Sequence, residues 1–379
     1  MQHQIIPIGK DLTSAYLGIK EFGPDAIHLL ITDETQDLYP SLTAMLPASV
    51  ETFIYRVGPF DGHSVQAVCH DIHHRFRGTF SYNLSASTKI MTHAAFQVAS
   101  AYHAPAFYVS QDGQLIDFYT FDARPLAMSM DNDEFIQLSG NRYCSYHDID
   151  ALTQEDISGS HAIQHFIENE HKDHERIQRY YAQRCHRRMG ALPQQFALED
   201  QLQVSTKGGA LTIRKGHKTL MQLESGNSCF LYFEGRWWET LVAEQVKRWR
   251  SRICVQEHGQ TPPQTWQSVV FGVSDDPQRC KNEVDILLND KQKLIIIECK
   301  SGHISQDNVY HIDAVRETYG GDNSIAILAS YYPLDEYLRE KCADLHIHVF
   351  APSQFSERAY YIDCLPDWLE QVRKVLELE

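Results

Sequence analysis

Charged residues interrupt an apolar stretch at positions 283–302 (EVDILLNDKQKLIIIECKSG), which otherwise predicts two strands joined by a polar turn at 289–292. Side chains alternate between the two faces of a strand, so Glu298 and Lys300 share one face. A hairpin through the turn brings Asp285, on the first strand, close to this pair. We therefore expect acids and a lysine at one corner of a sheet whose other positions are apolar.

This combination of side chains is suited to the hydrolysis of a phosphodiester bond. Two neighbouring carboxylates, here Asp285 and Glu298, repel each other, and a divalent cation bound through their oxygens relieves the repulsion. The expected metal is Mn²⁺ or Mg²⁺. A lysine such as Lys300 can orient or deprotonate a metal-bound water, or offset charge on a phosphate. The alternative is purely structural, because charges at strand ends are common and an E-x-K triplet also occurs by chance.

A third acid lies upstream, in the segment 229–249 (CFLYFEGRWWETLVAEQVKRW). Glu239 stands at the start of an expected helix and can point back toward the hairpin. A glutamate in the first turn of a helix is also favourable for the helix itself, so helix capping is the structural alternative. Glu283 shares a strand face with Asp285, and we expect it to act beside the metal ligands rather than as one of them.

The order of these residues resembles the PD-(D/E)xK nuclease fold, with an acid on a helix, an acid on a strand and then E-x-K. The resemblance covers roughly residues 225–350, and the sequence NEVD stands where the PD dipeptide is usual. It implies that Glu239, Asp285 and Glu298 bind the metal and that Lys300 completes the catalytic set.

The composition of the whole chain sets wider limits. Its 379 residues are enough for two or three domains with their own cores. A hydrophobic content of 43% and a charged content of 22% are typical of soluble globular proteins, and no apolar run approaches membrane-spanning length. The N-terminus has no signal-peptide pattern, and the nine cysteines include no C-x-x-C pair. We expect a cytoplasmic protein with no membrane partner, no structural zinc and no disulfide framework.

The net charge of -16 argues against a protein that coats nucleic acid, because affinity for phosphate backbones is largely electrostatic. Two basic segments with interleaved aromatic residues stand out against this charge, at 176–188 (RIQRYYAQRCHRR) and 246–252 (VKRWRSR). We expect each to be the solvated face of an amphipathic helix. The alternative is contact with a nucleic-acid backbone and stacking on its bases.

Strand-like and helical patterns alternate through the first 120 residues. Apolar runs at 4–8, 27–32, 50–57 and 79–85 are each followed by a helical pattern, which predicts a parallel sheet with helices on its faces. A hairpin is expected around Asp112 and Gly113. Between about 150 and 225 the chain becomes polar, helical and rich in histidine, then gives short strands with glycine turns.

We therefore predict an α/β protein with three domains. They are a Rossmann-like domain at 1–150, a helical connector or small middle domain at 151–225 and, as the PD-(D/E)xK resemblance implies, a restriction-endonuclease-like domain at 226–379.

Ligands of parallel sheets bind beyond the carboxyl ends of the strands. The loops expected there are PIGK (7–10), TDET (32–35), VGPFDG (57–62) and SASTK (85–89). The last is a small-residue loop that opens a helix, so it offers backbone N–H groups and hydroxyls to an anion, and Lys89 adds a charge. The chain has no G-x-G-x-x-G after its first strand and no G-x-x-x-x-G-K-[ST], which disfavours dinucleotides and nucleoside triphosphates. An ordinary capped helix is the structural alternative.

The segment YNLSASTKIM (82–91) resembles the N-[LI]-T-G-G-T-K-x-M signature of CARF domains, the CRISPR-associated Rossmann folds that sense cyclic oligoadenylates. Five residues match the signature, whereas Ser-Ala-Ser stands in place of Thr-Gly-Gly. The resemblance implies a ligand site built from the loops above. Its expected residues are Gly9, Lys10, Thr32, Asp33, Glu34, Asn83, Ser85, Ala86, Ser87, Thr88 and Lys89.

A CARF domain followed by such a nuclease domain is similar to the CRISPR ancillary nucleases of type III systems over nearly the whole chain. In that family cyclic tetra-adenylate, made when foreign RNA is detected, activates a metal-dependent nuclease. The resemblance implies antiviral cleavage of single-stranded DNA or RNA, and it leaves ring size, strand preference and duplex nicking open. A ring of four identical nucleotides has two-fold symmetry, which suits a homodimer. Two alternatives remain: a ligand-sensing regulator that binds nucleic acid without cutting it, and a restriction-like or repair endonuclease without a sensor.

Overall fold

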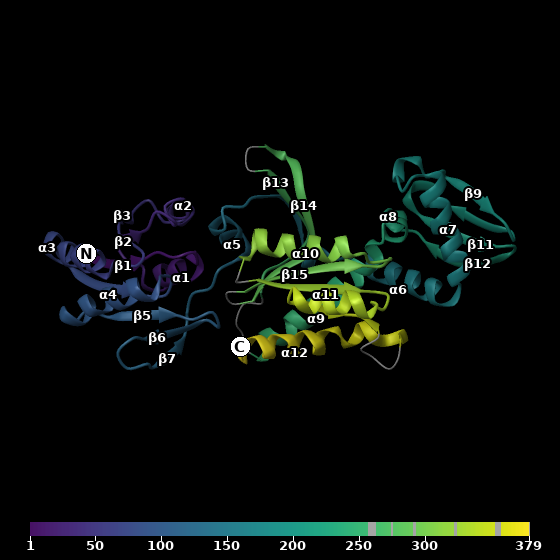
Figure 1. Ribbon diagram of the computed structural model, residues 1–379. Coiled ribbons are helices and arrows are strands. Elements are labelled where there is room, and N and C mark those ends of the chain that lie inside the picture. Colours follow the sequence, from purple (N-terminus) through teal and green to yellow (C-terminus); the bar gives the residue numbers. More distant parts are fainter. Residues whose placement is uncertain (257–262, 274–275, 291–292, 322–323, 353–357, 379) are drawn as a thin grey trace.

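The computed structural model describes residues 1–256, 263–273, 276–290, 293–321, 324–352 and 358–378. It contains three separate sheets. Figure 1 shows the N-terminal sheet at one end of an elongated molecule, the C-terminal sheet in the middle and the sheet of the middle segment at the other end. None of the helices in these ranges has the length and apolar character needed to cross a membrane.

The N-terminal sheet has the order β3-β2-β1-β4-β5-β6-β7, and its first five strands are parallel. This confirms the predicted succession of strands and helices, and the antiparallel pair β5–β6 confirms the hairpin at Asp112 and Gly113. The elements are β1 (Gln2–Pro7), α1 (Leu12–Phe22), β2 (Ala26–Ile31), α2 (Tyr39–Ala44), β3 (Glu51–Arg56), α3 (Gly62–Arg75), β4 (Thr79–Asn83), α4 (Lys89–Ala101), β5 (Ala106–Val109), β6 (Gln114–Asp117) and β7 (Ala123–Pro125).

The direction of winding changes at β1, which has β2 on one side and β4 on the other. The loops that follow β1 and β4 therefore meet at the carboxyl edge of the sheet, where parallel sheets bind ligands. These are the loops at 7–10 and 85–89 that the sequence singled out.

The C-terminal sheet has the order β17-β16-β15-β14-β13-β8. Strands β14 and β15 form the predicted antiparallel hairpin, although part of its turn, at 291–292, lies outside the described residues. The elements are β13 (Thr265–Val273), β14 (Asp276–Asp290), β15 (Lys293–Lys300), α10 (Gln306–Tyr319), β16 (Ser324–Ser330), α11 (Glu336–Asp344), β17 (Ile347–Phe350), a 3₁₀ segment (Arg358–Cys364) and α12 (Leu365–Leu378).

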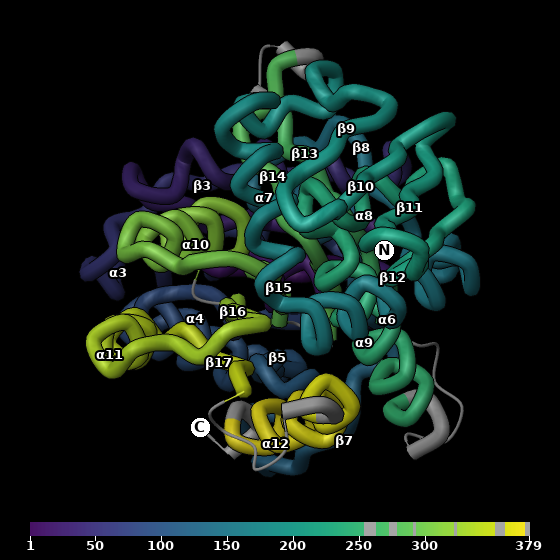
Figure 2. The backbone as a smooth tube through the Cα atoms, turned by 90° about the vertical axis from the view of Figure 1, so that its right-hand side faces the viewer, coloured from purple at the N-terminus to yellow at the C-terminus, as the bar shows by residue number. Residues whose placement is uncertain are grey.

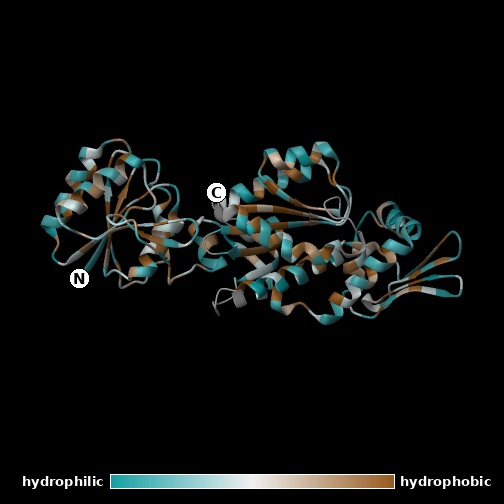
Figure 3. Ribbon diagram, turned by 90° about the horizontal axis from the view of Figure 1, so that it is seen from below, coloured by the Kyte–Doolittle hydropathy of each residue, from teal (hydrophilic) through white to brown (hydrophobic). Residues whose placement is uncertain are grey.

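Helices cover both faces of this sheet, as Figure 2 shows with α10 and α11 on one side and α9 (Arg236–Gln256) and α12 on the other. The alternation of side chains explains the two layers. On β16, Ile325 and Ile327 pack into the core with α9 and α12, whereas Ala326 and Leu328 pack against α10 and α11. Figure 3 shows that hydrophobic residues concentrate on the strands and on the helix faces turned toward them.

The middle segment packs onto the C-terminal part of the molecule. Helix α6 contacts α9, and one continuous core joins residues of the four-stranded sheet β12-β11-β10-β9 to Trp237 and Trp238 of α9. The elements are α6 (Gln154–Asn169), α7 (His171–Arg184), β9 (Gln195–Leu198), β10 (Leu202–Ser205), β11 (Leu211–Lys215), β12 (Lys218–Leu223), α8 (Ser228–Phe233) and short 3₁₀ turns at Ile149–Ala151, Met189–Ala191 and Lys207–Gly209.

Strand β8 (Tyr143–Asp148) joins the C-terminal sheet as an edge strand paired with β13, although the predicted sensor domain extends to residue 150. Aromatic packing helps to hold it there, because Tyr146 stacks on Trp266 with ring centroids 3.9 Å apart. The division of the chain at residues 150 and 225 stays a prediction.

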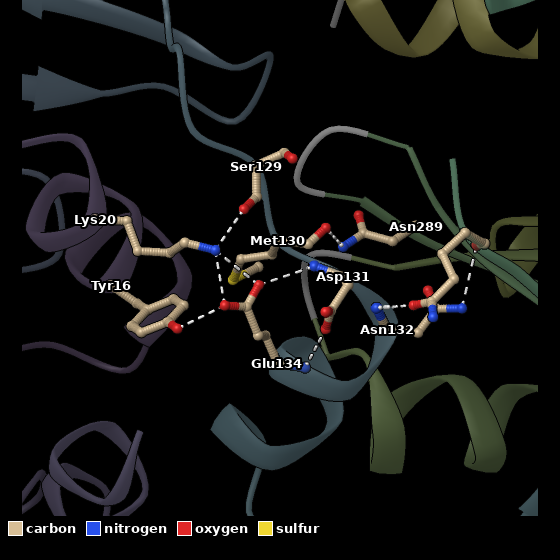
Figure 4. A network of polar contacts seen from close by, with 9 residues as sticks. Tyr16, Lys20, Ser129, Met130, Asp131, Asn132, Glu134 and Asn289 are labelled. Carbon is tan, nitrogen blue, oxygen red and sulfur yellow. Dashed lines mark hydrogen bonds and ion pairs between the residues drawn. The ribbon is translucent and has the colours of Figure 1, made fainter. Parts of the chain in front are cut away.

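A polar junction connects the N-terminal sheet layer to the C-terminal sheet through α5 (Asn132–Leu138), as Figure 4 shows. On the N-terminal side, Glu134 accepts hydrogen bonds from Lys20 Nζ at 2.7 Å and from the Tyr16 hydroxyl at 2.7 Å, and both donors lie on α1. On the C-terminal side, the Asn132 backbone N–H donates to the Gln264 side chain at 2.9 Å. The Asn289 side chain, on β14, donates to the Met130 carbonyl at 3.1 Å.

Candidate functional site

The four residues predicted to be catalytic meet at the carboxyl end of β15. Glu239 lies in the first turn of α9, Asp285 on β14, and Glu298 and Lys300 on β15. The strand register pairs Ile286 with Ile297, so the next residues along, Asp285 and Glu298, stand beside each other. We call this set the catalytic corner.

Hydrogen bonds fix the strand residues of the catalytic corner. The Asp285 Oδ2 atom accepts a hydrogen bond from the backbone N–H of Cys299 at 2.6 Å. Lys300 Nζ forms an ion pair and hydrogen bond with Glu298 Oε1. The Glu298 residue is 9% exposed, so this pair is largely shielded from water.

Two features position Glu239. Gly235 has φ +82°, and a Cβ atom there would lie 2.6 Å from Ser301 Oγ, so only glycine lets the turn before α9 touch the residue after Lys300. The buried Trp238 donates from Nε1 to the Ala329 carbonyl on β16 at 2.8 Å and so anchors the first turn of α9 to the sheet. The aromatic sequence ahead of Glu239 therefore has a structural purpose.

The electrostatics of the catalytic corner differ strongly from those of exposed acids. Burial raises the pKa of Glu239 to about 7, with Glu283 and Glu298 adding to the rise and Arg236 and Lys300 opposing it. Burial, followed by the charges of Glu298 and Glu239, raises the pKa of Asp285 well above its usual range.

Burial and the neighbouring charges act on the pKa of Lys300 in opposite directions. Burial acts to lower its pKa, but the neighbouring carboxylates of Glu298 and Asp285 outweigh burial, and the net pKa is raised. Lys300 is therefore a permanent positive charge at neutral pH and a poor proton acceptor.

The donor set of the catalytic corner fits a hard divalent cation in its chemistry, because carboxylate oxygens are the ligands that Mg²⁺ and Mn²⁺ prefer. Among the described residues, no group of three or more His, Cys, Asp or Glu side chains is arranged closely enough to hold a metal ion. Burial and the crowding of the three carboxylates raise the pKa values of Glu239 and Asp285, and a bound cation would oppose this rise. Glu283 is exposed at the edge of the catalytic corner. Its expected role beside the metal ligands, rather than as one of them, stays a prediction.

The predicted ligand loops are in direct contact at the switch point of the N-terminal sheet. A Cβ atom on Gly9 would lie 1.9 Å from the Ala86 carbonyl oxygen, so a side chain at position 9 cannot be accommodated without moving the 85–89 loop. Asn83 is fully buried and ties this loop to α1, because its side-chain nitrogen donates to the Ala15 carbonyl at 3.2 Å.

Most side chains of the 85–89 loop are already used to hold it in place. Ser85 Oγ donates to the Asn83 side-chain oxygen, and Ser87 Oγ lies 2.9 Å from Thr92 Oγ1. Thr88 Oγ1 caps α4 by accepting from the Met91 N–H and donates to the Pro59 carbonyl at 2.7 Å. The conformation of the loop is thus set internally, as the capped-helix alternative expected.

Two lysines at the same edge remain available to an anion. Lys10, directly before α1, and Lys89, the first residue of α4, are both exposed. Neither forms an ion pair with any residue in the ranges that the structure describes. Together with the backbone N–H groups at the start of α4, they offer positive charge and hydrogen-bond donors to an anion.

The 32–35 loop is only partly open to a ligand. Thr32 is 3% exposed, and its backbone N–H is taken by Thr35 Oγ1 at 3.0 Å. Asp33 and Glu34 are exposed, and Arg56 pairs with Asp33 at 3.2 Å. Arg56 was missed by the sequence reasoning, although its place as the last residue of β3 puts it at the ligand edge.

Comparison with known proteins finds a family match in the C-terminal part of the chain. Residues 230–371 match the family described as Card1-like, endonuclease domain. No curated protein matches the chain by sequence. The structure of Can2 from Sulfobacillus thermosulfidooxidans in complex with cyclic tetra-adenylate is 18% identical, with a TM-score of 0.70 and coverage of 98% of this chain and 99% of that one.

Two further solved structures are similar. Protein VC1899 from Vibrio cholerae is 17% identical, with a TM-score of 0.73 over 98% of both chains. A type III CRISPR defence DNA nuclease activated by cyclic oligoadenylate is 14% identical, with a TM-score of 0.52 over 87% of this chain and 45% of that one. The predicted α/β fold is confirmed, with a Card1-like endonuclease domain match in its C-terminal part, and the chain shares its fold with Can2 and with a type III CRISPR defence nuclease.

Proposed function

We propose that this protein is a nuclease of type III CRISPR antiviral defence that hydrolyses phosphodiester bonds in single-stranded DNA or RNA when it binds a cyclic oligoadenylate. The observation that carries the proposal is the convergence of Glu239, Asp285, Glu298 and Lys300 at one corner, from α9, β14 and β15, within the Card1-like endonuclease domain.

The residues of the catalytic corner have distinct roles in this proposal. Glu239, Asp285 and Glu298 would hold Mn²⁺ or Mg²⁺, which when bound supplies positive charge to the scissile phosphate and activates water. Lys300 keeps its proton, so it neutralises charge on the phosphate rather than acting as a base. Glu239, whose pKa is about 7 without a metal, would give up its proton when it binds the ion.

The activator is assigned to the carboxyl edge of the N-terminal sheet. The Can2 structure that shares this fold is in complex with cyclic tetra-adenylate. In this chain, Lys10 and Lys89 would contact the ring phosphates, and the α4 backbone N–H groups would add hydrogen bonds. The two-fold symmetry of a four-nucleotide ring favours a homodimer in which both copies offer the same loops.

The junction in Figure 4 offers a physical route between the two sites. Helix α1 begins two residues after Lys10, and its Tyr16 and Lys20 bind Glu134 on α5. The segment around α5 then bonds to Asn289 on β14, the strand that carries Asp285. A ligand that favours one arrangement of α1 and α5 can therefore change the population of active nuclease.

The test is a cleavage assay with end-labelled single-stranded DNA and RNA in Mn²⁺ or Mg²⁺, with and without cyclic tri-, tetra- and hexa-adenylate. We expect hydrolysis that depends on one of these ligands and is absent from Asp285→Ala protein. A regulator that only binds nucleic acid gives no products under any condition. A restriction-like or repair enzyme cuts equally well without a cyclic ligand. Either outcome would show that the proposal is wrong.

A further inference from the structure

The basic segment at 176–188 has no part in the function proposed above. It forms the C-terminal half of α7 and the turn that follows, and it carries five arginines at positions 176, 179, 184, 187 and 188. One side of the segment lines a cavity of about 990 Å³. We call this cavity the substrate cleft.

Parts of the chain that are distant in sequence form the walls of the substrate cleft. Helix α7 lies on one side, and the loops after β15 and β16 lie on the other. The turn before α9 contributes Gly235, and the first turn of α9 contributes Trp237. The loop after β15 contributes Ser301, which follows Lys300 directly and meets Gly235. The catalytic corner therefore borders the substrate cleft.

Acidic and basic side chains both line the substrate cleft, and they differ in the contacts that they already make. The three lining acids already make local contacts: Glu175 lies 3.3 Å from the His171 ring, Glu234 pairs with Arg236 at 3.4 Å, and Asp335 caps α11 by accepting the Leu338 N–H at 2.8 Å. Arg179 and Arg187 also line the cleft and are exposed, and neither has an ion-pair partner among the described parts of the chain. The cleft therefore presents two free guanidinium groups to an anion.

The backbone after α7 directs Arg187 to this position. His186 has φ +50° and Arg187 has φ +55°, a left-handed conformation that non-glycine residues rarely adopt. The Arg187 N–H donates back to the Tyr181 carbonyl at 3.2 Å, which closes the end of the helix. The chain thus accepts backbone strain at a residue that lines the cleft, and such strain often accompanies function.

The lining favours a single strand over a duplex. A duplex presents mainly its phosphates to a protein surface, whereas the bases of a single strand can stack on aromatic side chains. The substrate cleft combines Arg179 and Arg187 with the partly exposed ring of Tyr332, whereas Trp237 is 2% exposed and belongs to the core beneath the cleft. Guanidinium groups beside aromatic rings are the usual composition of sites that bind single strands.

We infer that the substrate cleft binds the single strand to be cut, with Arg179 and Arg187 contacting its phosphates and directing it to the catalytic corner. This inference rests on the proposed nuclease function. It assigns the 176–188 segment of the middle domain to substrate binding and explains how a chain with a net charge of -16 holds a polyanion.

The experiment measures the affinity of the full-length protein for a fluorescein-labelled oligo(dT) single strand by anisotropy, in EDTA so that no cutting occurs, over a range of salt concentrations. The double variant Arg179→Ala/Arg187→Ala should weaken binding on the order of tenfold and reduce the salt slope by about 1.4, or about 0.7 for each lost phosphate contact. The variant Arg179→Lys/Arg187→Lys, which keeps both charges, should restore most of the affinity.

A matched control is Arg184→Ala/Arg188→Ala, which removes the same charge from exposed arginines of the same segment that do not line the cleft. Equal loss in both double variants, or no loss in the first, would overturn the assignment. An equal loss of affinity for blunt duplex DNA would show that the surface reads duplex backbones instead. If the wild-type protein with activator and Mn²⁺ cuts no strand at all, the proposed function fails, whatever the binding result.

Discussion

The pKa of Glu239 makes the stability of the metal-free protein depend on pH in a defined direction. Burial raises this pKa from 4.5 to about 7, so the folded protein binds the Glu239 proton more tightly than the unfolded chain does. The resulting stabilisation is fully present below pH 4.5 and is lost as the pH rises through 7. A shift of this size corresponds to about 3 kcal/mol.

The perturbation is Glu239→Gln, which keeps the shape of the side chain and removes the titration. In EDTA, the free energy of unfolding of the wild type minus that of Glu239→Gln should fall by about 3 kcal/mol between pH 4.5 and pH 8. For a unit of 150–250 residues this corresponds to roughly 6–12 °C in the difference between the two melting temperatures. The assay is thermal unfolding of both proteins over this pH range, and taking the difference cancels groups that titrate alike in both.

Adding Mn²⁺ gives a second reading from the same samples. A metal that binds the charged carboxylate must displace the proton, so Mn²⁺ should restore the stability that the wild type loses at high pH and should do so less in Glu239→Gln. A difference in melting temperature that stays constant from pH 4.5 to 8, or equal stabilisation of both proteins by Mn²⁺, would refute the reasoning.

Three other predictions address the two sites and the junction between them. Asp285→Ala and Glu298→Ala should each abolish cleavage while circular dichroism and activator binding stay unchanged, because the remaining carboxylates hold the metal poorly; a fully active Glu298→Ala protein would contradict the assignment. Lys89→Ala should raise the activator concentration for half-maximal cleavage about tenfold in saturating Mn²⁺, and an unchanged titration would mean that the 85–89 loop is not the sensor. Glu134→Gln weakens the bonds to Tyr16 and Lys20 at 2.7 Å, so the ratio of cleavage with activator to cleavage without it should fall roughly 5- to 150-fold. A ratio equal to that of the wild type would exclude this contact from the coupling.

Local patterns in the sequence were sufficient for the strands and helices of the first 120 residues and for the β14–β15 hairpin. Each of these elements has its own apolar periodicity and its own turn signal, and pairing within a hairpin joins residues that are close in sequence. The types of residue at the catalytic corner were also readable, because E-x-K after an apolar strand places Glu298 and Lys300 on one face whatever surrounds them.

The charge states at the catalytic corner came only from the tertiary structure. Nothing local distinguishes Glu239 from an ordinary glutamate at a helix start. Its raised pKa requires the first turn of α9 to be fixed on β16 by the Trp238–Ala329 hydrogen bond, next to residues that follow more than forty positions later. Burial and neighbouring charge are properties of packing, and they decide which acid carries a proton at neutral pH.

Strand β8 and the substrate cleft also could not be predicted from the local sequence alone. The sequence YCSYHD of β8 is polar and half-exposed, and its partner β13 begins more than a hundred residues later, so pairing at the sheet edge decided its structure rather than propensity. The basic pattern at 176–188 was visible, but whether Arg179 and Arg187 face bulk water or a cleft depends on where α7 packs relative to the loops after β15 and β16. That relation is set by the shared core between the middle segment and α9, because only contacts distant in sequence bury those surfaces together.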